Sequence, residues 1–327
     1  MRIGERAAAT DPGRKRRRNE DSYVVDPPLF AVADGMGGAQ AGEVASRLAA
    51  AAFREYHEAD DLPADERIPA IVQEANRRIY ERAREDAQAS GMGTTVTAAL
   101  LESERLVVGH VGDSRAYRLH GDEITQITDD HSLVADLVRS GRLTQQEAET
   151  HPQRSVITRA LGTDPEVDVD AIAVEAEPGD VILLCSDGLT TMVADDAILK
   201  IVREAPSLED AARELVRAAN RGGGEDNVTV ILFRIDEGDD PALDETQAIA
   251  SNGNPTDADL EDTLSGLETE APAAAAPPET AEAPQTTIVP PEPVAPPRRR
   301  GRKIAVGLIL LVLILALAAA GYWILAR

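Results

Sequence analysis

The sequence predicts an α+β fold in which helices pack on the outside of antiparallel sheets. Short apolar runs rich in β-forming residues recur close together, which favours antiparallel pairing over the strict strand–helix alternation of a parallel sheet. Between these runs lie amphipathic stretches with helical spacing. The expected strands are residues 29–33, 94–101, 106–111, 116–119, 181–185 and 227–235.

Four stretches between and after these runs predict the helices. Residues 41–58 are rich in alanine, the best helix former. Residues 68–89 place Ile71 and Ile79 on one face and charged residues on the other. The remaining two helices are expected at residues 189–204 and 208–221. Outside the helices, the turn at residues 120–123 (HGDE) predicts a hairpin.

Composition divides the chain of 327 residues into a folded part and a tail. Residues 1–236 carry 27 basic and 44 acidic residues, a net charge of −17, and enough apolar residues for a sizeable core. Residues 237–297 hold 14 acidic residues, no Lys or Arg, and 11 of the 20 prolines. Such a segment buries too little apolar area to offset the entropy of ordering, so we expect a disordered linker.

The end of the chain has the pattern of a membrane anchor. Residues 304–325 form an uninterrupted apolar stretch, whose helical length of ~33 Å would span a ~30 Å hydrocarbon core. The basic segment 298–303 (RRRGRK) precedes it and, by the positive-inside rule, stays cytoplasmic. We therefore expect one C-terminal transmembrane helix in the cell membrane, with the folded domain in the cytoplasm. A buried core helix is the alternative, which the length of the apolar stretch disfavours.

Charge and cysteine content exclude some classes of function. A net charge of −25 argues against nucleic acid as the main partner, because phosphate contacts need a basic surface. The basic run 14–18 alone could be a nucleic-acid patch, but the rest of the domain is acidic. The single cysteine, Cys185, rules out an internal disulfide, and its apolar strand favours a core position over a nucleophile.

Four aspartates stand where apolar strands begin or end, each next to a glycine or another short polar residue. One Asp-Gly pair alone would usually be an ordinary turn, whereas four at strand boundaries indicate a shared edge. Gathered there, the carboxylates would repel one another unless a cation neutralised them, and oxygen-only ligands select hard ions such as Mg²⁺ or Mn²⁺. The four are Asp34, Asp113, Asp187 and Asp226, and a further acidic site lies at residues 19–21.

Six segments resemble, in order, the motifs of the PPM-type (type-2C) metal-dependent serine/threonine protein phosphatases. Any one of them is weak, but six in the family order are specific, and the match covers about residues 5–236. The linker and anchor resemble those of the bacterial membrane-anchored members that oppose serine/threonine kinases. The segments are residues 10–21 (TDPGRKRRRNED), 34–38 (DGMGG), 93–95 (GTT), 111–115 (VGDSR), 186–189 (SDGL) and 226–229 (DNVT).

This resemblance implies a four-layer αββα sandwich of two antiparallel sheets, with two or three Mn²⁺ or Mg²⁺ ions at one edge. Asp34 would bridge two ions. The backbone carbonyl of Gly35 would contact one of these ions, and Asp187 and Asp226 the other. Asp113, together with Asp187, would form a weaker third site.

The resemblance also assigns the groups around the ions. Glu20 and Asp21 would hold metal-bound waters. Motif spacing alone selects Arg16, rather than Arg17 or Arg18, as the phosphate-binding arginine. Met36 occupies the place where eukaryotic relatives carry a histidine proposed as general acid, and bacterial members share this methionine. The proton for the leaving oxygen must then come from water or another group. Residues 131–165 resemble the flap beside the site in bacterial members, and an ordinary pair of short helices is the alternative.

The expected reaction is hydrolysis of phosphoserine and phosphothreonine in proteins by a metal-activated water. Two ions ~3.5–4 Å apart lower the pKa of a shared water and clamp the phosphoryl oxygens. The planar guanidinium of Arg16 can hold two of those oxygens. Two rival functions are hydrolysis of small phosphomonoesters, which membrane anchoring disfavours, and a catalytically silent scaffold, which retention of the whole acidic set disfavours.

The expected partners are phosphorylated proteins, including serine/threonine kinases. Thr246 in the linker follows two acidic residues and precedes Ile249 by three positions. This pattern resembles a phosphothreonine site for forkhead-associated domains, which bind phosphate through an arginine-lined pocket. An unmodified, solvated linker threonine is the alternative.

Overall fold

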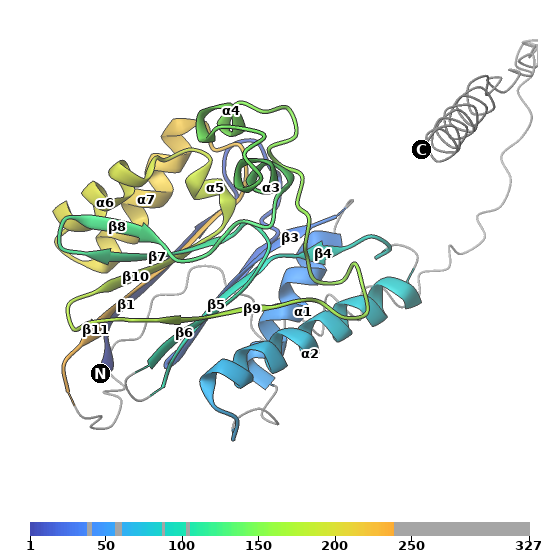
Figure 1. Ribbon diagram of the computed structural model, residues 1–327, viewed down its shortest axis with the longest axis horizontal. Helices are drawn as coiled ribbons and strands as arrows, with labels where there is room; N and C mark the ends of the chain where they lie inside the picture. The colour runs from blue at the N-terminus through green and yellow to red at the C-terminus, as the bar shows by residue number, and fades with distance from the viewer. Residues whose placement is uncertain (38–40, 56–60, 87–88, 103–104, 239–327) are drawn as a thin grey trace, which may run out of the picture. The chain divides into compact units, whose positions relative to one another are not determined.

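The computed structural model describes residues 1–37, 41–55, 61–86, 89–102 and 105–238. These residues form two antiparallel sheets packed face to face, with helices on the outer face of each sheet (Figure 1). The predicted αββα sandwich is therefore confirmed for the part of the chain that the structure describes.

The first sheet has five strands in the order β1-β11-β10-β7-β8. Its two central strands, β10 and β11, are almost wholly buried, because one face packs on helices and the other on the second sheet. In their antiparallel register Cys185 lies opposite Val230, so the end of β10 lies beside the start of β11. The strands are β1 (Arg2–Asp11), β7 (Arg115–His120), β8 (Glu123–Gln126), β10 (Val181–Cys185) and β11 (Val228–Asp236).

The second sheet runs in the order β2-β3-β5-β6-β9, with the short strand β4 paired to the end of β3. The register of the β2–β3 hairpin places Asp21 directly opposite Asp34. Two acidic residues thus become neighbours across two strands. The strands are β2 (Asp21–Asp26), β3 (Leu29–Met36), β4 (Gly93–Thr94), β5 (Val96–Glu102), β6 (Arg105–Val111) and β9 (Asp170–Val174).

Helices cover the outer face of each sheet, and two short helices lie between β8 and β9. The helix before β11 illustrates the local signals, because Ser207 accepts a hydrogen bond from the backbone of Asp210 at its start and Gly223 follows its end. Helices α1 (Ala41–Glu55) and α2 (Ala64–Glu85) cover the second sheet, and α5 (Asp187–Thr190), α6 (Asp195–Glu204) and α7 (Leu208–Gly222) cover the first. The flap segment contains α3 (Leu133–Arg139) and α4 (Gln145–Glu149).

The core consists of three apolar layers, one between the sheets and one beneath each helical layer. In the central layer Phe30 of β3 stacks on Phe233 of β11, with ring centroids 4.2 Å apart and planes 8° from parallel. This contact joins the two strands whose other ends carry acidic residues. The sandwich core therefore holds the acidic edge of one sheet against that of the other.

The structure differs from the sequence prediction in several elements. The helix expected at residues 189–204 is two helices, α5 and α6, because the backbone is extended at Ala194 and the second helix begins after it. The run expected as one strand at residues 94–101 divides into β4 and β5. Helix α2 begins at Ala64, earlier than expected, and contains Pro69. The hairpin predicted at residues 120–123 is confirmed and joins β7 to β8, whereas the edge strands β1, β2 and β9 were not among the expected strands.

The predictions for the C-terminal part fall on residues that the structure does not describe. These are the linker beyond residue 238, with Thr246, the basic segment 298–303 and the apolar stretch 304–325. Among the described residues, no helix combines the length and the apolar character needed to cross a bilayer.

Candidate metal centre

The acidic residues singled out in the sequence lie at the ends of strands from both sheets. Asp34 is part of β3, near its end, whereas Asp113 follows β6. Asp187 begins α5, two residues after β10, and Asp226 stands just before β11. Because β10 and β11 are antiparallel neighbours, Asp187 and Asp226 reach the same edge. The sandwich thus brings together residues that are almost two hundred positions apart.

The side chains of Asp34 and Asp187 lie close enough for each to shift the pKa of the other. Asp226 is held differently. Its Oδ2 accepts a hydrogen bond of 2.8 Å from the Arg16 guanidinium, and its Oδ1 accepts one of 2.8 Å from the backbone of Asn227. Within the described part of the chain, no three His, Cys, Asp or Glu side chains converge as a complete metal-ligand set.

The carboxyl groups at this edge influence one another electrostatically. Burial raises the pKa of Asp34 well above its ordinary value, and repulsion from Asp21, Asp187, Asp113 and Asp226 raises it further. Burial also raises the pKa of Asp21 to about 7, although hydrogen bonds from Thr229 and Ser186 oppose the change. Each carboxylate therefore disfavours the charged form of its neighbouring carboxyl groups.

The same two causes act on the remaining pair. Burial raises the pKa of Asp187 to about 6, with repulsion from Asp226 as the next cause. Burial and repulsion from Asp187 raise the pKa of Asp113 to about 7. A bound cation would remove the repulsion and favour the charged carboxylates.

The donor atoms fit a hard divalent cation. Two buried carboxylate oxygens, Asp21 Oδ1 and Asp187 Oδ1, have no hydrogen-bond partner, and a buried acceptor left unpaired costs about 1–3 kcal/mol. The available ligands are carboxylates and the Gly35 carbonyl, so every donor is an oxygen, as Mg²⁺ and Mn²⁺ prefer. Asp34, Asp187 and the Gly35 carbonyl could hold such an ion. Without it, Asp226 and Asp113 lie close enough to Asp34 for their charge to raise its pKa.

Two glycines allow the backbone segments at the site to approach closely. A Cβ at Gly35 would lie 2.1 Å from the Gly42 carbonyl oxygen and 2.5 Å from that of Glu20. A Cβ at Gly188 would lie 2.0 Å from the Asn227 carbonyl oxygen. All three distances are far shorter than a carbon–oxygen contact allows, so a side chain at either glycine would force the neighbouring backbone segments apart.

A chain of hydroxyl groups fixes the Asp21 carboxylate. Its Oδ2 accepts hydrogen bonds from Thr229 Oγ1 at 2.6 Å and from Ser186 Oγ at 2.8 Å. The Thr229 proton is used in this bond, so the Thr10 hydroxyl, 2.8 Å away, donates to Thr229. Thr10 in turn accepts from Asn19 Nδ2 at 2.7 Å. With Oδ2 saturated, Asp21 keeps Oδ1 free of protein donors.

Asn227 connects the two segments that carry Arg16 and Asp226. It is only 4% exposed. Its Oδ1 accepts from the Glu20 backbone at 2.8 Å, and its Nδ2 donates to the carbonyls of Pro12 at 3.0 Å and Arg18 at 2.8 Å. The loop that carries Arg16 is therefore clamped at both ends beside Asp226.

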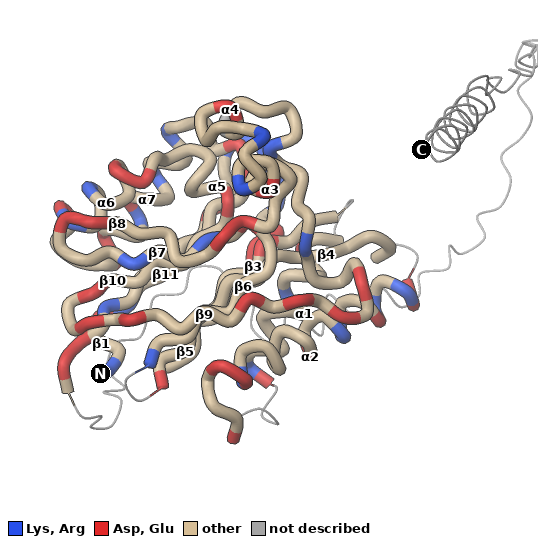
Figure 2. Tube along the Cα trace, in the orientation of Figure 1, with Lys and Arg blue, Asp and Glu red and all other residues tan. Residues whose placement is uncertain are grey.

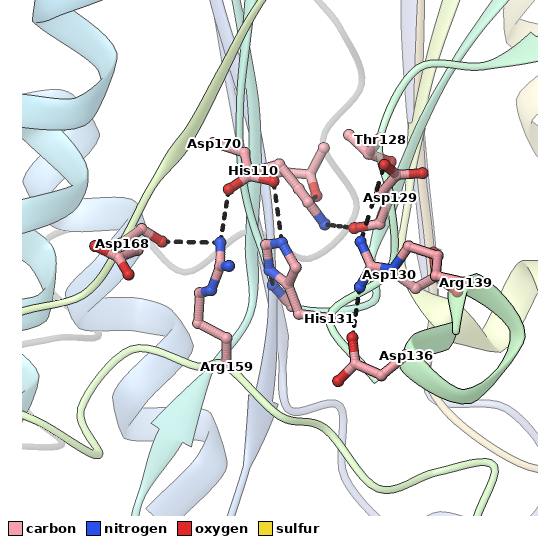
Figure 3. A network of polar contacts seen from close by, with 12 residues as sticks. His110, Thr128, Asp129, Asp130, His131, Asp136, Arg139, Arg159, Asp168 and Asp170 are labelled. Carbon is pink, nitrogen blue, oxygen red and sulfur yellow. Dashed lines mark hydrogen bonds and ion pairs between the residues drawn. The ribbon is translucent and has the colours of Figure 1, made fainter. Parts of the chain in front are cut away.

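A histidine network ties the flap to the strand end that carries Asp113. Figure 3 shows the part of this network formed by His131, Asp170 and Arg159. The His131 backbone donates to the Gly112 carbonyl at 2.7 Å, and His131 Nδ1 accepts from the Gly112 backbone at 3.0 Å. With Nδ1 an acceptor, Nε2 carries the proton and donates to Asp170 at 3.1 Å. Arg159 at the other end of the flap donates to the same Asp170 at 2.6 Å.

His110 packs against His131, with ring centroids 4.7 Å apart. Its Nε2 donates to the Asp129 carbonyl at 3.1 Å, and its Nδ1 lies 3.0 Å from Thr97 Oγ1. The base of the flap is thus built on buried groups of the second sheet. In contrast, α3 has no buried residue.

The sequence analysis named the acidic residues and Arg16 but not the groups that position them. Ser186, Asn227 and Thr229 lie inside the quoted motifs, immediately beside the aspartates, and this proximity was the available signal. His131 and Asp170 carried no such signal, since their contact depends on the path of the flap.

Comparisons with known proteins agree with this geometry. The protein phosphatase 2C family model matches residues 14–227. The chain is 43% identical over 263 residues to the serine/threonine protein phosphatase PstP of Mycobacterium tuberculosis, covering 80% of this chain and 50% of that protein. The chain therefore spans about half the length of this relative.

A shorter relative matches over almost its whole length. The serine/threonine phosphatase stp of Listeria innocua is 40% identical over 233 residues, covering 68% of this chain and 92% of that protein. Among solved structures, the catalytic domain of PstP in complex with two manganese ions superposes with a TM-score of 0.66 at 41% identity, covering 72% of this chain and 100% of that one.

The hydroxyl chain predicts a specific effect on metal binding. Thr229→Val removes one donor to Asp21 at nearly constant volume, and we expect it to weaken Mn²⁺ binding by about 10- to 100-fold, as loss of a group that orients a ligand does. Thr229→Ser keeps the hydroxyl and should bind Mn²⁺ like the parent. Isothermal titration calorimetry measures both.

The exposed Thr125→Val on β8 serves as the matched control, and thermal unfolding shows whether each variant is folded. Equal Mn²⁺ affinity for the Thr229→Val protein and the parent would contradict the assigned role of the hydroxyl.

Acid should destabilise the protein through His110. Burial, and then repulsion from His131, lowers its pKa to about 4, whereas an unfolded histidine titrates near ~6.5. Between pH ~6.5 and ~4 the unfolded chain therefore binds a proton that the folded chain does not. The contribution is fully present above pH ~6.5, and its loss on acidification lowers the free energy of unfolding by up to about 3 kcal/mol.

Urea unfolding of the parent and of His110→Asn, between pH ~7.5 and ~4.5, tests this expectation. His131 and Asp170 titrate in both proteins, so the difference in pH dependence isolates His110. On unfolding at acidic pH, the His110→Asn protein should take up about one proton fewer than the parent, whatever its stability at neutral pH. Parallel pH profiles would show that His110 does not titrate as stated.

Proposed function

The chain belongs to the protein phosphatase 2C family, and on that basis we propose that it hydrolyses phosphoserine and phosphothreonine in proteins. The observation that carries the proposal is the meeting of Asp34 with Asp187, close to the Arg16–Asp226 pair, at one edge of the sandwich. This arrangement combines oxygen ligands for cations with a guanidinium for phosphate. The named relatives are serine/threonine phosphatases, which supports the same activity.

Each acidic residue receives a role in this proposal. Two ions, Mn²⁺ or Mg²⁺, would be held by Asp34, Gly35, Asp187 and Asp226, and a third by Asp113 with Asp187. Glu20 and Asp21 would accept hydrogen bonds from waters around the ions. When bound, the ions supply an activated water and offset the charge of the phosphoryl oxygens.

Arg16 would orient the phosphate. Its side chain is 52% exposed and is held at the site by one hydrogen bond to Asp226. The remaining N–H groups of its planar fork are available for two phosphoryl oxygens. Met36, at the end of β3, has no proton to give, so the leaving serine or threonine oxygen would take its proton from water or another group.

We propose that the enzyme acts at the cell membrane. The apolar stretch 304–325 and the basic segment 298–303 support an anchor with the catalytic domain in the cytoplasm. Substrates would then include membrane-associated phosphoproteins and the serine/threonine kinases that the enzyme opposes. Thr246, once phosphorylated, would bind a forkhead-associated domain. Thr246 found unmodified by mass spectrometry in kinase-active cells would count against that last point.

The activity is tested with phosphoserine, phosphothreonine and phosphotyrosine peptides, measuring phosphate release with and without Mn²⁺. We expect metal-dependent hydrolysis of the first two. Asp34→Asn and Asp187→Asn should each lose at least about 100-fold in activity, because each removes a charged ligand at nearly constant shape.

Asp122→Asn is the matched control, since its side chain is 78% exposed at the β7–β8 turn. Circular dichroism would confirm that the variants fold. Near-normal activity of either ligand variant would overturn the metal assignment. Hydrolysis of small phosphate esters but not of the phosphopeptides would favour the small-molecule rival, and no hydrolysis at all would favour the scaffold.

Membrane attachment predicts in which fraction the protein is found when membranes are separated from soluble proteins. The full chain should sediment with membranes and resist extraction by high salt, because the apolar stretch rather than charge holds it there. Removal of residues 304–327 should release the protein to the soluble fraction. A full chain that remains soluble would contradict the anchor.

A further inference from the structure

A run of positive charge borders the candidate metal centre of a domain that is otherwise acidic. Residues 14–18, here called the basic loop, are five consecutive exposed cations, whereas residues 1–236 carry a net charge of −17. Figure 2 shows Asp and Glu spread over the strands, helices and turns of the molecule, for example along β9. The basic loop is therefore a local reversal of sign.

The backbone of the basic loop is fixed relative to the site. The backbone N–H groups of Arg14 and Lys15 donate to the Gly224 carbonyl at 2.8 and 3.1 Å. The Arg18 carbonyl accepts from Asn227 Nδ2 at 2.8 Å. Both ends of the loop are thus held by residues within two positions of Asp226, so its backbone stays beside that residue.

Three of the five cations already have partners. Arg14 Nε donates to the Asn220 carbonyl at 2.9 Å, Arg16 binds Asp226 at 2.8 Å, and Arg18 lies 3.5 Å from Glu43. The side chains of Lys15 and Arg17, which flank Arg16, have no hydrogen bond or ion pair with any other described residue. Two uncompensated cations are therefore the sequence neighbours of the residue assigned to the phosphate.

We infer that Lys15 and Arg17 bind acidic side chains close to the phosphorylated residue, so that the enzyme prefers acidic phosphopeptides. The inference rests on the proposed function, because Arg16 must hold the phosphate. In an extended peptide, neighbouring residues advance by ~3.3 Å, so a negative charge within about three positions lies within reach of these flanking cations.

The magnitude of the preference follows from exposed ion pairs. One such pair contributes at most about 1 kcal/mol, or roughly fivefold in an equilibrium constant. Two pairs should then raise kcat/KM for an acidic peptide about 5- to 20-fold over a neutral one at low salt. Added salt should reduce the ratio, since exposed charges are screened.

The test uses the full chain with Mn²⁺ and three phosphothreonine peptides that differ only in their flanking residues, which are Glu, Gln or Lys. The substrate p-nitrophenyl phosphate, which has no flanks, reports the chemistry alone. In the parent we expect kcat/KM to be highest for the Glu peptide, lower for the Gln peptide and lowest for the Lys peptide. The difference should arise from KM rather than from kcat. The double variant Lys15→Ala/Arg17→Ala should bring the Glu and Gln peptides within about twofold and leave p-nitrophenyl phosphate hydrolysis unchanged.

The control Arg84→Ala/Arg105→Ala removes the same charge from exposed positions on α2 and β6 and should keep the preference. Equal kcat/KM for the Glu and Gln peptides in the parent, or a preference that survives the double variant, would overturn the inference. Failure of the parent to hydrolyse any of the phosphothreonine peptides would instead overturn the proposed function itself, and the inference with it.

The basic loop could alternatively contact an anionic membrane surface. To distinguish the two, the parent and the double variant should be compared again on the same peptides, with the full chain in nanodiscs of neutral or anionic lipid. A double variant that changes activity only on anionic lipid, with the peptide preference intact, would assign the loop to the membrane and overturn the inference.

Discussion

The structure depends on holding several carboxylates together against their mutual repulsion. Asp21 and Asp34 face each other across a hairpin, and Asp187, which follows β10 of the other sheet, lies close enough to raise the pKa of Asp34. The raised pKa of these carboxyls records the unfavourable free energy of this arrangement. An assembly of this kind persists only when the rest of the fold fixes it, and it is suited to a divalent cation that reverses the repulsion.

The fold fixes the site at two levels. The central apolar layer, with the stacked Phe30 and Phe233, sets how the two sheets face each other. A shell of uncharged polar groups then orients the individual acids. Thr229 and Ser186 hold one oxygen of Asp21, and Asn227 holds the loop of Arg16. The acids themselves thus supply ligands, while their neighbours decide where each oxygen points.

The sequence predicted most of the central elements and fewer of the peripheral ones. Buried strands such as β10 and β11 have continuous apolar runs that are visible locally. The edge strand β1 contains Glu5 and Arg6 and is largely half-buried, so its strand structure depends on pairing with β11 rather than on its own pattern. The break between α5 and α6 likewise follows from the extended backbone at Ala194, after which α6 begins.

The available chemistry can be identified from the amino-acid sequence, because the acidic residues, Arg16 and the motifs around them are local features of the chain. Which of these groups meet depends on the folded arrangement of the two sheets. Arg16 lies 210 positions from Asp226, and Asp21 lies 208 positions from Thr229, yet each pair is joined by a hydrogen bond. Such contacts follow from strand register and from the packing of one sheet on the other, and no local pattern encodes either.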